Sequence, residues 1–317
     1  MGEIQGPVLS GRRSLLLGIA GLASAALTAC SASTGASRPS EATPLPSRTP
    51  TPVDLATPAP SRTGPAETPT AEPSRPAPPS KQQIVAEFAA RRPQEWGLHV
   101  TGVVNKSQAR HVALTFDACG GPGGAGCDVQ LLATLRKLNV AATLFVNERW
   151  IQVNRALATE LAHDPLFELA NHGFLHRPLS VNGKSAYGIA GTADVGQVYD
   201  ELMGNQGVLQ EITGHQARFF RPGTAFYDEV SAAITRRVGL LPVNFTVNGD
   251  AGATFDAATV AAEVGRVVSG DIVISHFNKP GSGTASGYAQ VLPRLLGQGI
   301  TFARLGSVLP AGRPAAL

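Results

Sequence analysis

The segment Asn171-His172-Gly173-Phe174-Leu175-His176 carries two histidines four residues apart. On one helical turn this spacing brings two imidazole rings to the same side, at a separation that suits a zinc-type ion. The segment also follows an apolar run that predicts a strand, and reactive groups of α/β proteins collect at strand ends. The pair therefore predicts a metal site, and two solvent-facing loop histidines are the alternative interpretation.

A carboxylate, Asp117, ends the apolar run Val112-Ala113-Leu114-Thr115-Phe116 and precedes a glycine-rich loop. A buried strand that delivers an acid at its carboxyl end is typical of parallel α/β folds. The other predicted strands also end on polar residues, although their bodies are apolar. These residues are Asn147, Glu148, Asn171, His172, Arg221, Asn248, Asp250, Ser275, His276 and Asn278. Because such ends meet at one edge of a parallel sheet, they predict an active site there.

The elements that would position these groups alternate between strand and helix from Trp96 onward. Strands are predicted over residues 111–116, 140–146, 166–170, 217–221, 241–247, 271–275 and 300–303. Helices are predicted over residues 128–138, with Asp128 as N-cap, and over 149–163, 194–213, 228–238, 256–268 and 285–297. A helix over 82–92 is expected to pack on the outside. About seven repeats predict an α/β fold with a parallel sheet, either open and doubly wound or closed as a barrel, and the length favours a barrel.

Four short motifs follow one another along the predicted domain. They are Thr115-Phe116-Asp117, His172-x-x-x-His176-x-Pro178, Arg218-Phe219-Phe220-Arg221-Pro222 and Ile272-Val273-Ile274-Ser275-His276. This series resembles the signature motifs of the polysaccharide deacetylases, carbohydrate esterase family four, over residues 110–305. The resemblance implies the nodulation-type deacetylase homology domain, a distorted (β/α) barrel that uses a metal-bound water to remove acetyl groups from sugars.

Carried over by position, the resemblance implies that Asp117 is the general base and that His172 and His176 hold the metal ion. Arg221 would orient Asp117 and keep it ionised, because a nearby cation favours the carboxylate. The implied cofactor is a divalent metal, and zinc is expected.

The resemblance also makes His276 the general acid that protonates the departing amine, with Asp250 behind it to keep it charged. The segment Pro222-Gly223 would supply a backbone amide as an oxyanion contact. Tyr187 and Phe226 are expected at the rim of the groove, where aromatic rings suit sugar contacts. Base, Lewis acid, oxyanion donor and general acid are together what amide or ester hydrolysis requires.

Ala118 departs from the family pattern, which has a second, metal-binding acid directly after the base. A methyl group binds no cation, and zinc sites generally have three protein ligands plus water. Asp117 itself, Asp128, Asn171 or additional water could fill the position, or metal and catalysis could be lost. The altered loop Ala118-Cys119-Gly120-Gly121 favours a working but modified site.

Other interpretations rest on single motifs. Gly121-Pro122-Gly123-Gly124-Ala125-Gly126 matches GxGxxG, but its proline and flanking cysteines disfavour a dinucleotide site. Cys119, Cys127 and the two histidines could form a structural zinc site, although the cysteine spacing is long for one. The sequence has no GxSxG elbow after a predicted strand, which disfavours a serine hydrolase. A non-catalytic glycan-binding lipoprotein on the same barrel is the main alternative, because the second acid is missing.

Residues 1–30 carry paired arginines before a short apolar run that ends in Leu27-Thr28-Ala29-Cys30. This pattern is typical of twin-arginine export, and it resembles a lipoprotein signal in which the cysteine is acylated. Simple cleavage, with Cys30 lost or unmodified, is the alternative. Residues 31–82 hold more than half of the 24 prolines and predict a disordered tether, which leaves 83–317 as the catalytic domain. We therefore expect an exported protein that is lipid-anchored to the outer face of a bacterial cytoplasmic membrane and reaches into the cell wall.

Cys119 and Cys127 form an even pair in an exported domain once Cys30 carries lipid, which predicts a disulfide between them. The net charge of +3 is mild and the basic residues are scattered, so nucleic acid is not expected as a partner. We expect a monomer that hydrolyses carbon–nitrogen bonds other than peptide bonds in a polysaccharide. Peptidoglycan, chitin-like oligomers and O-acetylated xylan stay open as substrates, and the anchor favours a wall glycan.

Overall fold

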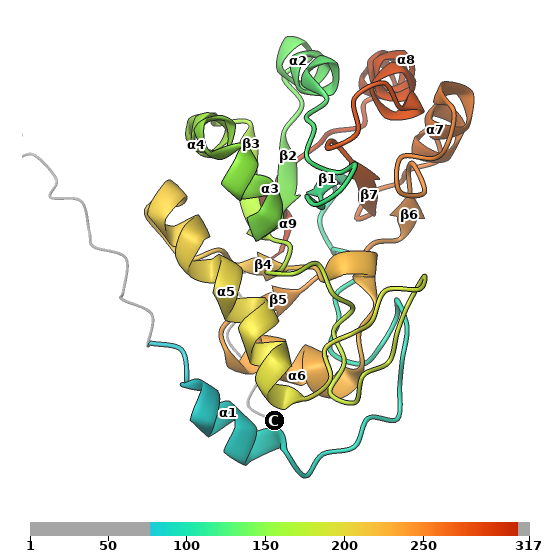
Figure 1. Cartoon of the computed structure of the whole chain (residues 1–317). Coiled ribbons are helices and arrows are strands. Elements are labelled where there is room, and N and C mark those ends of the chain that lie inside the picture. The colour runs from blue at the N-terminus through green and yellow to red at the C-terminus, as the bar shows by residue number, and fades with distance from the viewer. Residues whose placement is uncertain (1–76, 310–317) are drawn as a thin grey trace, which may run out of the picture. The chain divides into compact units, whose positions relative to one another are not determined.

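The computed structural model describes residues 77–309, which fold around one parallel sheet. Its strands are β1 (Ala113–Ala118), β2 (Ala142–Val146), β3 (Phe167–Asn171), β4 (Phe219–Phe220), β5 (Leu241–Pro242), β6 (Val247–Asn248) and β7 (Ile272–His276). They lie in the order β5-β4-β3-β2-β1-β7-β6 (Figure 1). Neighbouring strands in this order are also neighbours along the chain, with β7 next to β1, so the sheet curls into a ring that is open between β5 and β6. In a doubly wound sheet, by contrast, the strand order reverses direction part-way across the sheet. The prediction of a distorted parallel barrel is therefore confirmed as a curled half-barrel.

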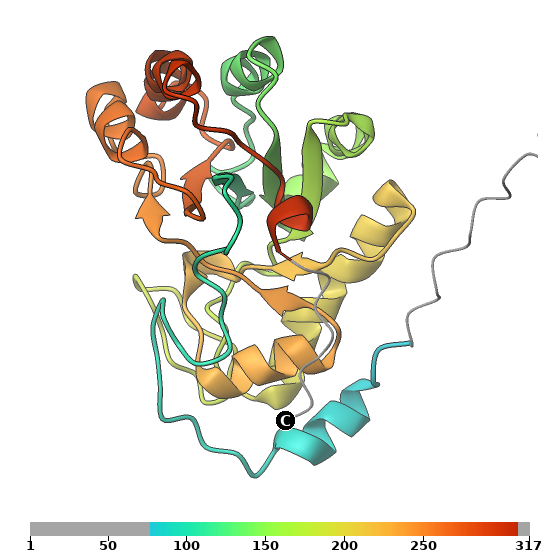
Figure 2. The same cartoon turned by 180° about the vertical axis from the view of Figure 1, so that it is seen from behind.

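The helices are α1 (Lys81–Phe88), α2 (Val129–Lys137), α3 (Glu148–Val153), α4 (Arg155–His163), α5 (Val195–Thr213), α6 (Glu229–Arg237), α7 (Ala257–Val264), α8 (Gly283–Gly297) and α9 (Leu305–Val308), with a 3-10 turn at Gly223–Ala225. Most of them surround the outer face of the sheet (Figure 1, Figure 2), whereas α9 packs in the apolar cluster on its inner face. Helix α1 packs on α5 and α6 through Ile84 and Phe88, which are fully buried. The predicted outer N-terminal helix is therefore confirmed.

Aspartate side chains begin four of these helices, because a carboxylate accepts a free backbone N–H of the first turn. The four N-caps are Asp128, Asp194, Asp228 and Asp256. Asp128 was predicted in this role, and its Oδ1 accepts the Leu131 amide at 3.1 Å. The single helix predicted over 149–163 is instead two helices, α3 and α4, because the backbone leaves the helical conformation at Asn154.

Alternation along β1 divides its side chains between two environments. The members that pack with the covering helices in the main core are Leu114, Phe116 and Ala118. The members on the opposite, inward face are Ala113, Thr115 and Asp117. Ala113 joins an apolar cluster inside the barrel with Leu305 and Val308 of α9. The inward face of β1 therefore begins in an apolar plug and ends on a carboxylate.

The strand predicted over 241–247 is instead two strands at opposite edges of the sheet. β5 pairs with β4 and β6 pairs with β7, and residues 243–246 cross the opening between them. Two hydrogen bonds from Arg221 hold this crossing, with Nε donating to the Val243 carbonyl at 3.2 Å and Nη2 to the Asn244 carbonyl at 3.1 Å. The side chain that was predicted to serve the active site therefore also spans the gap in the barrel.

Predictions near the ends of the chain have mixed outcomes. The strand predicted over 300–303 is wrong, since it is reduced to one bridge between Val112 and Phe302. Within residues 77–309, no helix combines the length and the apolar character needed to cross a bilayer. The predicted signal segment with Cys30, and the tether up to residue 76, lie outside the described residues and stay predictions.

Candidate active site

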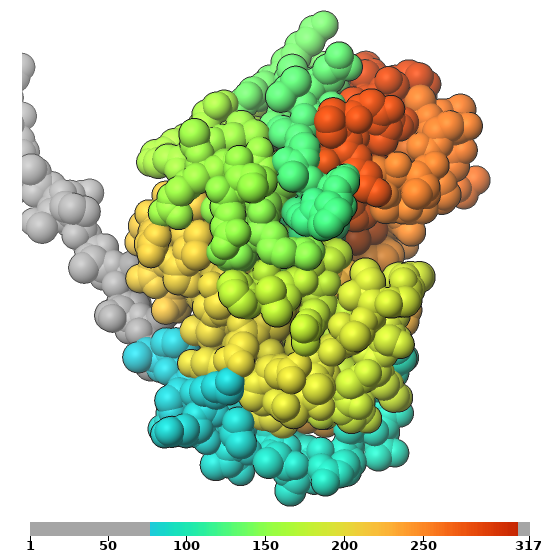
Figure 3. Space-filling model, viewed as in Figure 1, coloured from blue at the N-terminus to red at the C-terminus, as the bar shows by residue number. Residues whose placement is uncertain are grey.

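The polar residues predicted at strand ends meet at the carboxyl end of the sheet. Asp117 at the end of β1 lies next to His276 at the end of β7 in the strand register. Its Oδ2 is 3.7 Å from Nε2 of His172, which follows β3, and its Oδ1 is 2.8 Å from Nη1 of Arg221, which follows β4. The loops after β1 and β7 also lie side by side on the surface (Figure 3), and a β-carbon at Gly126 would lie 2.7 Å from Pro280 Cδ. Residues far apart in the sequence thus form one site.

Arg221 is fully buried, and each of its three side-chain nitrogens donates at least one hydrogen bond. Nη1 donates to Thr115 Oγ1 and to Asp117 Oδ1, both at 2.8 Å. Nε and Nη2 each donate one hydrogen bond to the backbone that crosses the barrel opening. A buried cation that is hydrogen-bonded on every side avoids the large penalty of an isolated charge. The arginine is therefore held in one orientation against the carboxylate.

Asp117 stays ionised in this environment. Burial alone would raise the pKa of its carboxyl. The positive charge of Arg221, together with the His172 and His276 rings, outweighs burial and holds the pKa of Asp117 below its usual value. The carboxylate is consequently free to accept a proton from a neighbouring water molecule.

His172 is oriented by a hydrogen bond from its far nitrogen. Nδ1 lies 2.8 Å from the backbone oxygen of Arg221, and because a carbonyl only accepts, Nδ1 must carry the proton. Nε2 then presents a lone pair toward Asp117 and Cys119. Burial is the main cause of a lowered pKa at His172, which favours the neutral ring. This is the state and the support that metal-binding histidines use.

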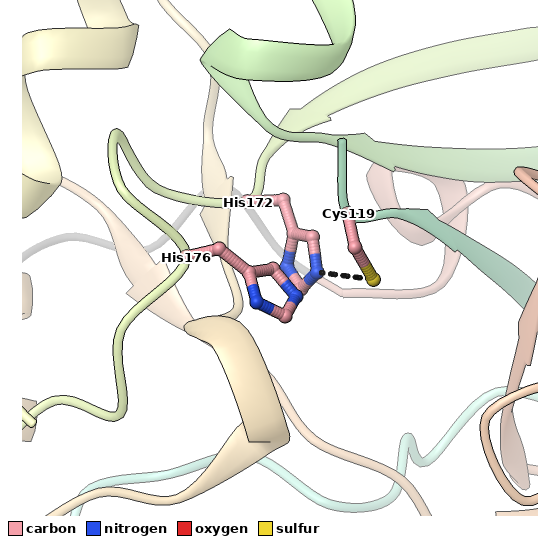
Figure 4. Close-up of side chains that lie close together, drawn as sticks. All are labelled: Cys119, His172 and His176. Atoms are coloured by element: carbon pink, nitrogen blue, oxygen red, sulfur yellow. Dashed lines mark hydrogen bonds between the residues drawn. The ribbon is translucent and has the colours of Figure 1, made fainter. Parts of the chain in front are cut away.

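His176 completes the histidine pair on an unusual backbone. Its φ angle is +62°, and its ring lies 4.9 Å from the His172 ring at an interplanar angle of 81° (Figure 4). A β-carbon at Gly223 would collide with the backbone and ring of His176. Gly223 was predicted as part of an oxyanion contact. In the structure, its lack of a side chain is what lets His176 pack against it.

Glu201 on α5 holds the loop that carries both histidines, and the sequence analysis did not identify it. Its buried carboxylate accepts the backbone N–H of Leu175 at 2.9 and 3.0 Å and that of Arg177 at 3.1 Å. A β-carbon at Gly173 would collide with this carboxylate. Burial raises the pKa of Glu201, because a buried carboxylate loses its hydration. The backbone N–H donors partly offset this desolvation penalty. The signal in the sequence was a run of polar residues, Glu201, Asn205 and Gln206, at helical spacing among the apolar residues of the buried face of α5.

Cys119, the residue after Ala118, points its sulfur at the histidine pair. Sγ lies 3.8 Å from His172 Nε2 (Figure 4). The nearest ligand atoms of Cys119, His172 and His176 all lie within 4.8 Å of one another. Within residues 77–309, these three side chains are the group found close enough together to bind one metal ion. Burial acts to raise the pKa of the thiol, but the His176 and His276 rings lower the pKa of Cys119 to about 6.

Asp250 and His276 form a second buried ion pair. Nδ1 of His276 is 2.9 Å from Asp250 Oδ1, and the His276 amide donates to Oδ2 at 2.6 Å. Thr284 Oγ1 also donates to Oδ2, at 2.9 Å. Burial would lower the pKa of His276, but the hydrogen bond and charge of Asp250 raise it well above the usual value. The imidazolium is therefore the resting form at neutral pH.

The predicted disulfide between Cys119 and Cys127 is absent, and both residues are free thiols. Cys119 faces the histidines, whereas Cys127 packs against the main core. Hydrogen bonds close the loop between them instead: Trp150 Nε1 donates to Gly126 O at 2.8 Å, and Asn278 Nδ2 donates to Gly124 O at 2.9 Å. The loop is thus fixed against α3 and the end of β7 without a covalent link, and its glycine amides do not form a dinucleotide turn.

Two of the residues predicted to replace the missing acid have other roles. Asp128 caps α2, and its donor atoms do not belong to the three-residue group described above. Asn171 is a buried scaffold residue whose Nδ2 donates to Leu202 O at 2.8 Å and whose Oδ1 accepts the Gly173 amide at 2.8 Å. Ala118 itself packs in the main core. Of the predicted alternatives, Asp117 remains beside the histidines.

Tyr187 and Phe226, predicted at the groove rim, contact each other edge to face, with their ring centres 5.4 Å apart. Tyr187 is 76% exposed. Trp96, which was not predicted, also packs against Phe226, with ring centres 5.6 Å apart, and the Lys184 ammonium is 6.0 Å from the Trp96 ring centre. The three rings form an aromatic row, because segments from before β1 and after β3 and β4 converge there.

Residues 104–243 match the protein-family model described as polysaccharide deacetylase. The match includes Asp117, both histidines and Arg221, and it ends before Asp250 and His276. The bifunctional xylanase/deacetylase of Pseudobutyrivibrio xylanivorans is 26% identical over 203 residues. That alignment covers 62% of this chain but 30% of the relative, so the chain spans less than a third of the relative's length.

Several solved structures share the fold. A family 4 carbohydrate esterase pseudoenzyme from Bacillus anthracis has a TM-score of 0.54 at 20% identity, covering 68% of this chain and 71% of its own. Bacillus subtilis PdaA, a family 4 carbohydrate esterase, has a TM-score of 0.53 at 19% identity, covering 74% and 92%. A family 4 acetyl xylan esterase from Clostridium thermocellum, in complex with a cobalt ion, has a TM-score of 0.52 at 22% identity, covering 65% and 95%. At these identities the likeness shows the fold alone.

Proposed function

We propose that this chain is a metal-dependent hydrolase that removes N-acetyl groups from a cell-wall or extracellular polysaccharide, since residues 104–243 match the polysaccharide deacetylase family model. O-acetyl groups are the second choice of bond, since the same groups serve ester hydrolysis. One observation carries the proposal. An ionised acid, two imidazole rings and a charged histidine, supplied by separate strands, face one another at the end of the barrel.

The donor atoms at this site fit a divalent ion. His172 has its proton fixed on Nδ1, so Nε2 is a free donor, and the His176 ring lies next to it. Imidazole nitrogen is a common ligand of zinc, the metal we expect. When bound, the ion would lower the pKa of a water molecule and polarise the acetyl carbonyl.

The protein groups supply the two proton transfers that the carbon–nitrogen cleavage needs, and the acetic acid formed loses its remaining proton to solvent. Asp117 accepts a proton from the water that adds to the acetyl carbon, and Arg221 keeps that carboxylate ionised and oriented. The carbon–nitrogen bond then breaks, and His276 donates its proton to the departing amine. Asp250 keeps His276 protonated before this step. Acetate and a free amino sugar are the products.

A polysaccharide suits the surface beside the site. Tyr187 is exposed, and it continues into the row of rings with Phe226 and Trp96. Aromatic faces bind the apolar faces of sugar rings with little loss of side-chain entropy. The predicted lipid anchor at Cys30 and the proline-rich tether would place the domain outside the cytoplasmic membrane, which favours a wall glycan as substrate.

The second candidate function is that of a non-catalytic glycan-binding lipoprotein. Ala118 favours it, because the family pattern has an acid at that position and a methyl group cannot bind a metal. A structural relative from Bacillus anthracis is itself described as a pseudoenzyme. Glycan affinity without acetate release would establish this candidate.

Acetate release from peptidoglycan, chitin oligomers and O-acetylated xylan tests the proposal. We expect release from at least one N-acetylated glycan by the native protein and almost none by Asp117→Asn. Asp256→Asn is a matched control, because the Asp256 carboxylate serves to cap α7 through the Thr259 amide and asparagine caps helices equally well. No release from any substrate by protein loaded with zinc would contradict the proposal.

A further inference from the structure

We propose that Cys119 is the third protein ligand of the metal, so that two imidazole nitrogens and a thiolate hold the ion. The inference rests on the proposed metal-dependent function and concerns how this chain manages without an acid at position 118. Its basis is the position of the Cys119 sulfur beside His172 and His176 (Figure 4).

The backbone of β1 explains why position 119 and not 118 reaches the site. Side chains alternate along a strand, so Asp117 and Cys119 point inward while Ala118 points into the helix-covered core. Ligands of one tetrahedral zinc ion, with metal–sulfur and metal–nitrogen bonds of about 2.3 and 2.0 Å, lie roughly 3.5 Å apart. The sulfur of Cys119 is 3.8 Å from Nε2 of His172. A small adjustment of the side chains therefore suffices for both to bind one ion.

A shared scaffold holds the cysteine and the histidine loop together. Arg149 Nη2 donates to the Cys119 carbonyl at 3.1 Å, and its Nε donates to Asn147 Oδ1 at 3.2 Å. Asn147 Nδ2 in turn donates to the backbone oxygens of His172 and Gly173 at 2.9 and 2.7 Å. Hydrogen bonds of this kind orient metal ligands and raise metal affinity.

Gly120 fixes the direction in which the chain leaves Cys119. Its φ angle is +66°, and a β-carbon there would lie 2.5 Å from the Trp150 backbone nitrogen. Only glycine meets both conditions without strain. The glycine-rich loop therefore sets the position of the cysteine as well as its own path.

A thiolate ligand changes which metal the site prefers. Thiolate and imidazole favour zinc and cobalt, whereas carboxylate and water favour magnesium and manganese. The sulfur-containing site should therefore bind zinc or cobalt much more tightly than manganese.

Titration of the metal-free full chain with Co²⁺ tests the inference. We expect one equivalent to bind and to produce a near-ultraviolet thiolate-to-cobalt charge-transfer band. Cys127→Ser is the matched control and keeps the band, because Cys127 packs against the core away from the histidines. Cys119→Ser loses the band and weakens binding by more than the roughly 10- to 100-fold cost of losing an outer-shell partner.

Two further measurements protect the test against misfolding of the variant. Zinc should shield Cys119 of the native protein from alkylation, and Cys119→Asp should bind metal without the band. Cobalt binding to the native protein without the band, or unchanged cobalt affinity in Cys119→Ser, would overturn the inference. If the native protein still released acetate in that case, the proposed function would stand. Acetate release by metal-free protein that stops on alkylation of Cys119 would instead make the cysteine a nucleophile and overturn both.

Discussion

The two ends of the barrel interior are built from the same strands but have opposite characters. At the amino ends, Ala113 and Ile272 pack with Leu305 of α9 in a closed apolar cluster. At the carboxyl ends, the same faces of β1 and β7 carry Asp117 and His276, which are charged. Moving along one strand face therefore changes the environment from a sealed core to a reactive site. Stability and chemistry are assigned to different ends of the sheet, as is general for parallel barrels.

Arg221 lies at the boundary between these two ends. Its guanidinium is 4.2 Å from the centre of the Phe145 ring, which belongs to the apolar cluster, and it also bonds to Asp117. A planar, weakly hydrated cation can serve both neighbours, since it stacks on a ring while its edge donates hydrogen bonds. The comparison predicts that substitutions at the carboxyl ends of the strands alter activity with little effect on stability. Substitutions at the amino ends should lower stability with little effect on the activity of the folded protein.

The largest effect is expected at the reactive end from Asp117→Asn. Asparagine keeps an oxygen for Arg221 but cannot accept a proton, so turnover should fall by about 10²- to 10⁴-fold, the usual contribution of a general base. Circular dichroism should show a folded protein. Steady-state acetate release measures the loss, and a rate equal to that of the native protein would remove Asp117 from the role of base.

Leu305→Ala makes the opposite test at the sealed end. The side chain is fully buried in the apolar cluster, and such truncations cost about 2–5 kcal/mol of unfolding free energy. Chemical denaturation should show this loss, while kcat of the folded protein changes less than twofold. A large drop in kcat at temperatures where the variant is folded would show that the two ends are coupled.

Asp250→Asn alters the pH dependence more than the maximal rate. The folded pKa of His276 is raised by Asp250, so the stability that the pair contributes is fully present below the unfolded pKa of about 6.5 and is lost as pH rises through the folded value. Without the negative charge at position 250, the pKa of His276 should fall, because the carboxylate that favours the protonated ring is gone. The alkaline limb of the kcat profile should then move to lower pH by the same amount. An unmoved limb would mean that another group donates the proton.

Much of the fold was predictable because strand and helix periods were strong and aspartate caps stood where helices begin. The prediction of one strand over 241–247 was wrong, because this apolar run contributes a short strand to each edge of the sheet. The break between the two strands depends on tertiary contacts with Arg221, which the local sequence does not show. The strand expected over 300–303 failed for a related reason, because the chain turns into the barrel interior at α9.

The site was predictable to the extent that its residues end strands. Asp117, His172 and His276 were found in this way, and the structure brings them together. Cys119 was assigned to a disulfide because an even cysteine count in an exported domain favours pairing, and sequence alone does not show which way a side chain points after a strand ends. Glu201 was missed because a positioning acid has no motif of its own.

The smallest effect is expected at the rim, from Tyr187→Ala. The Tyr187 ring is 76% exposed and contacts Phe226 only edge to face, so its removal should not unfold the domain. Aromatic contacts contribute about 0.5–1.5 kcal/mol, which corresponds to a KM increase of roughly 2- to 12-fold with kcat unchanged. Tyr187→Phe keeps the ring and should keep the native KM. If KM for a polymeric glycan stays the same in Tyr187→Ala, the sugar chain leaves the site by another path, and the reactive end of the barrel acts without the aromatic row.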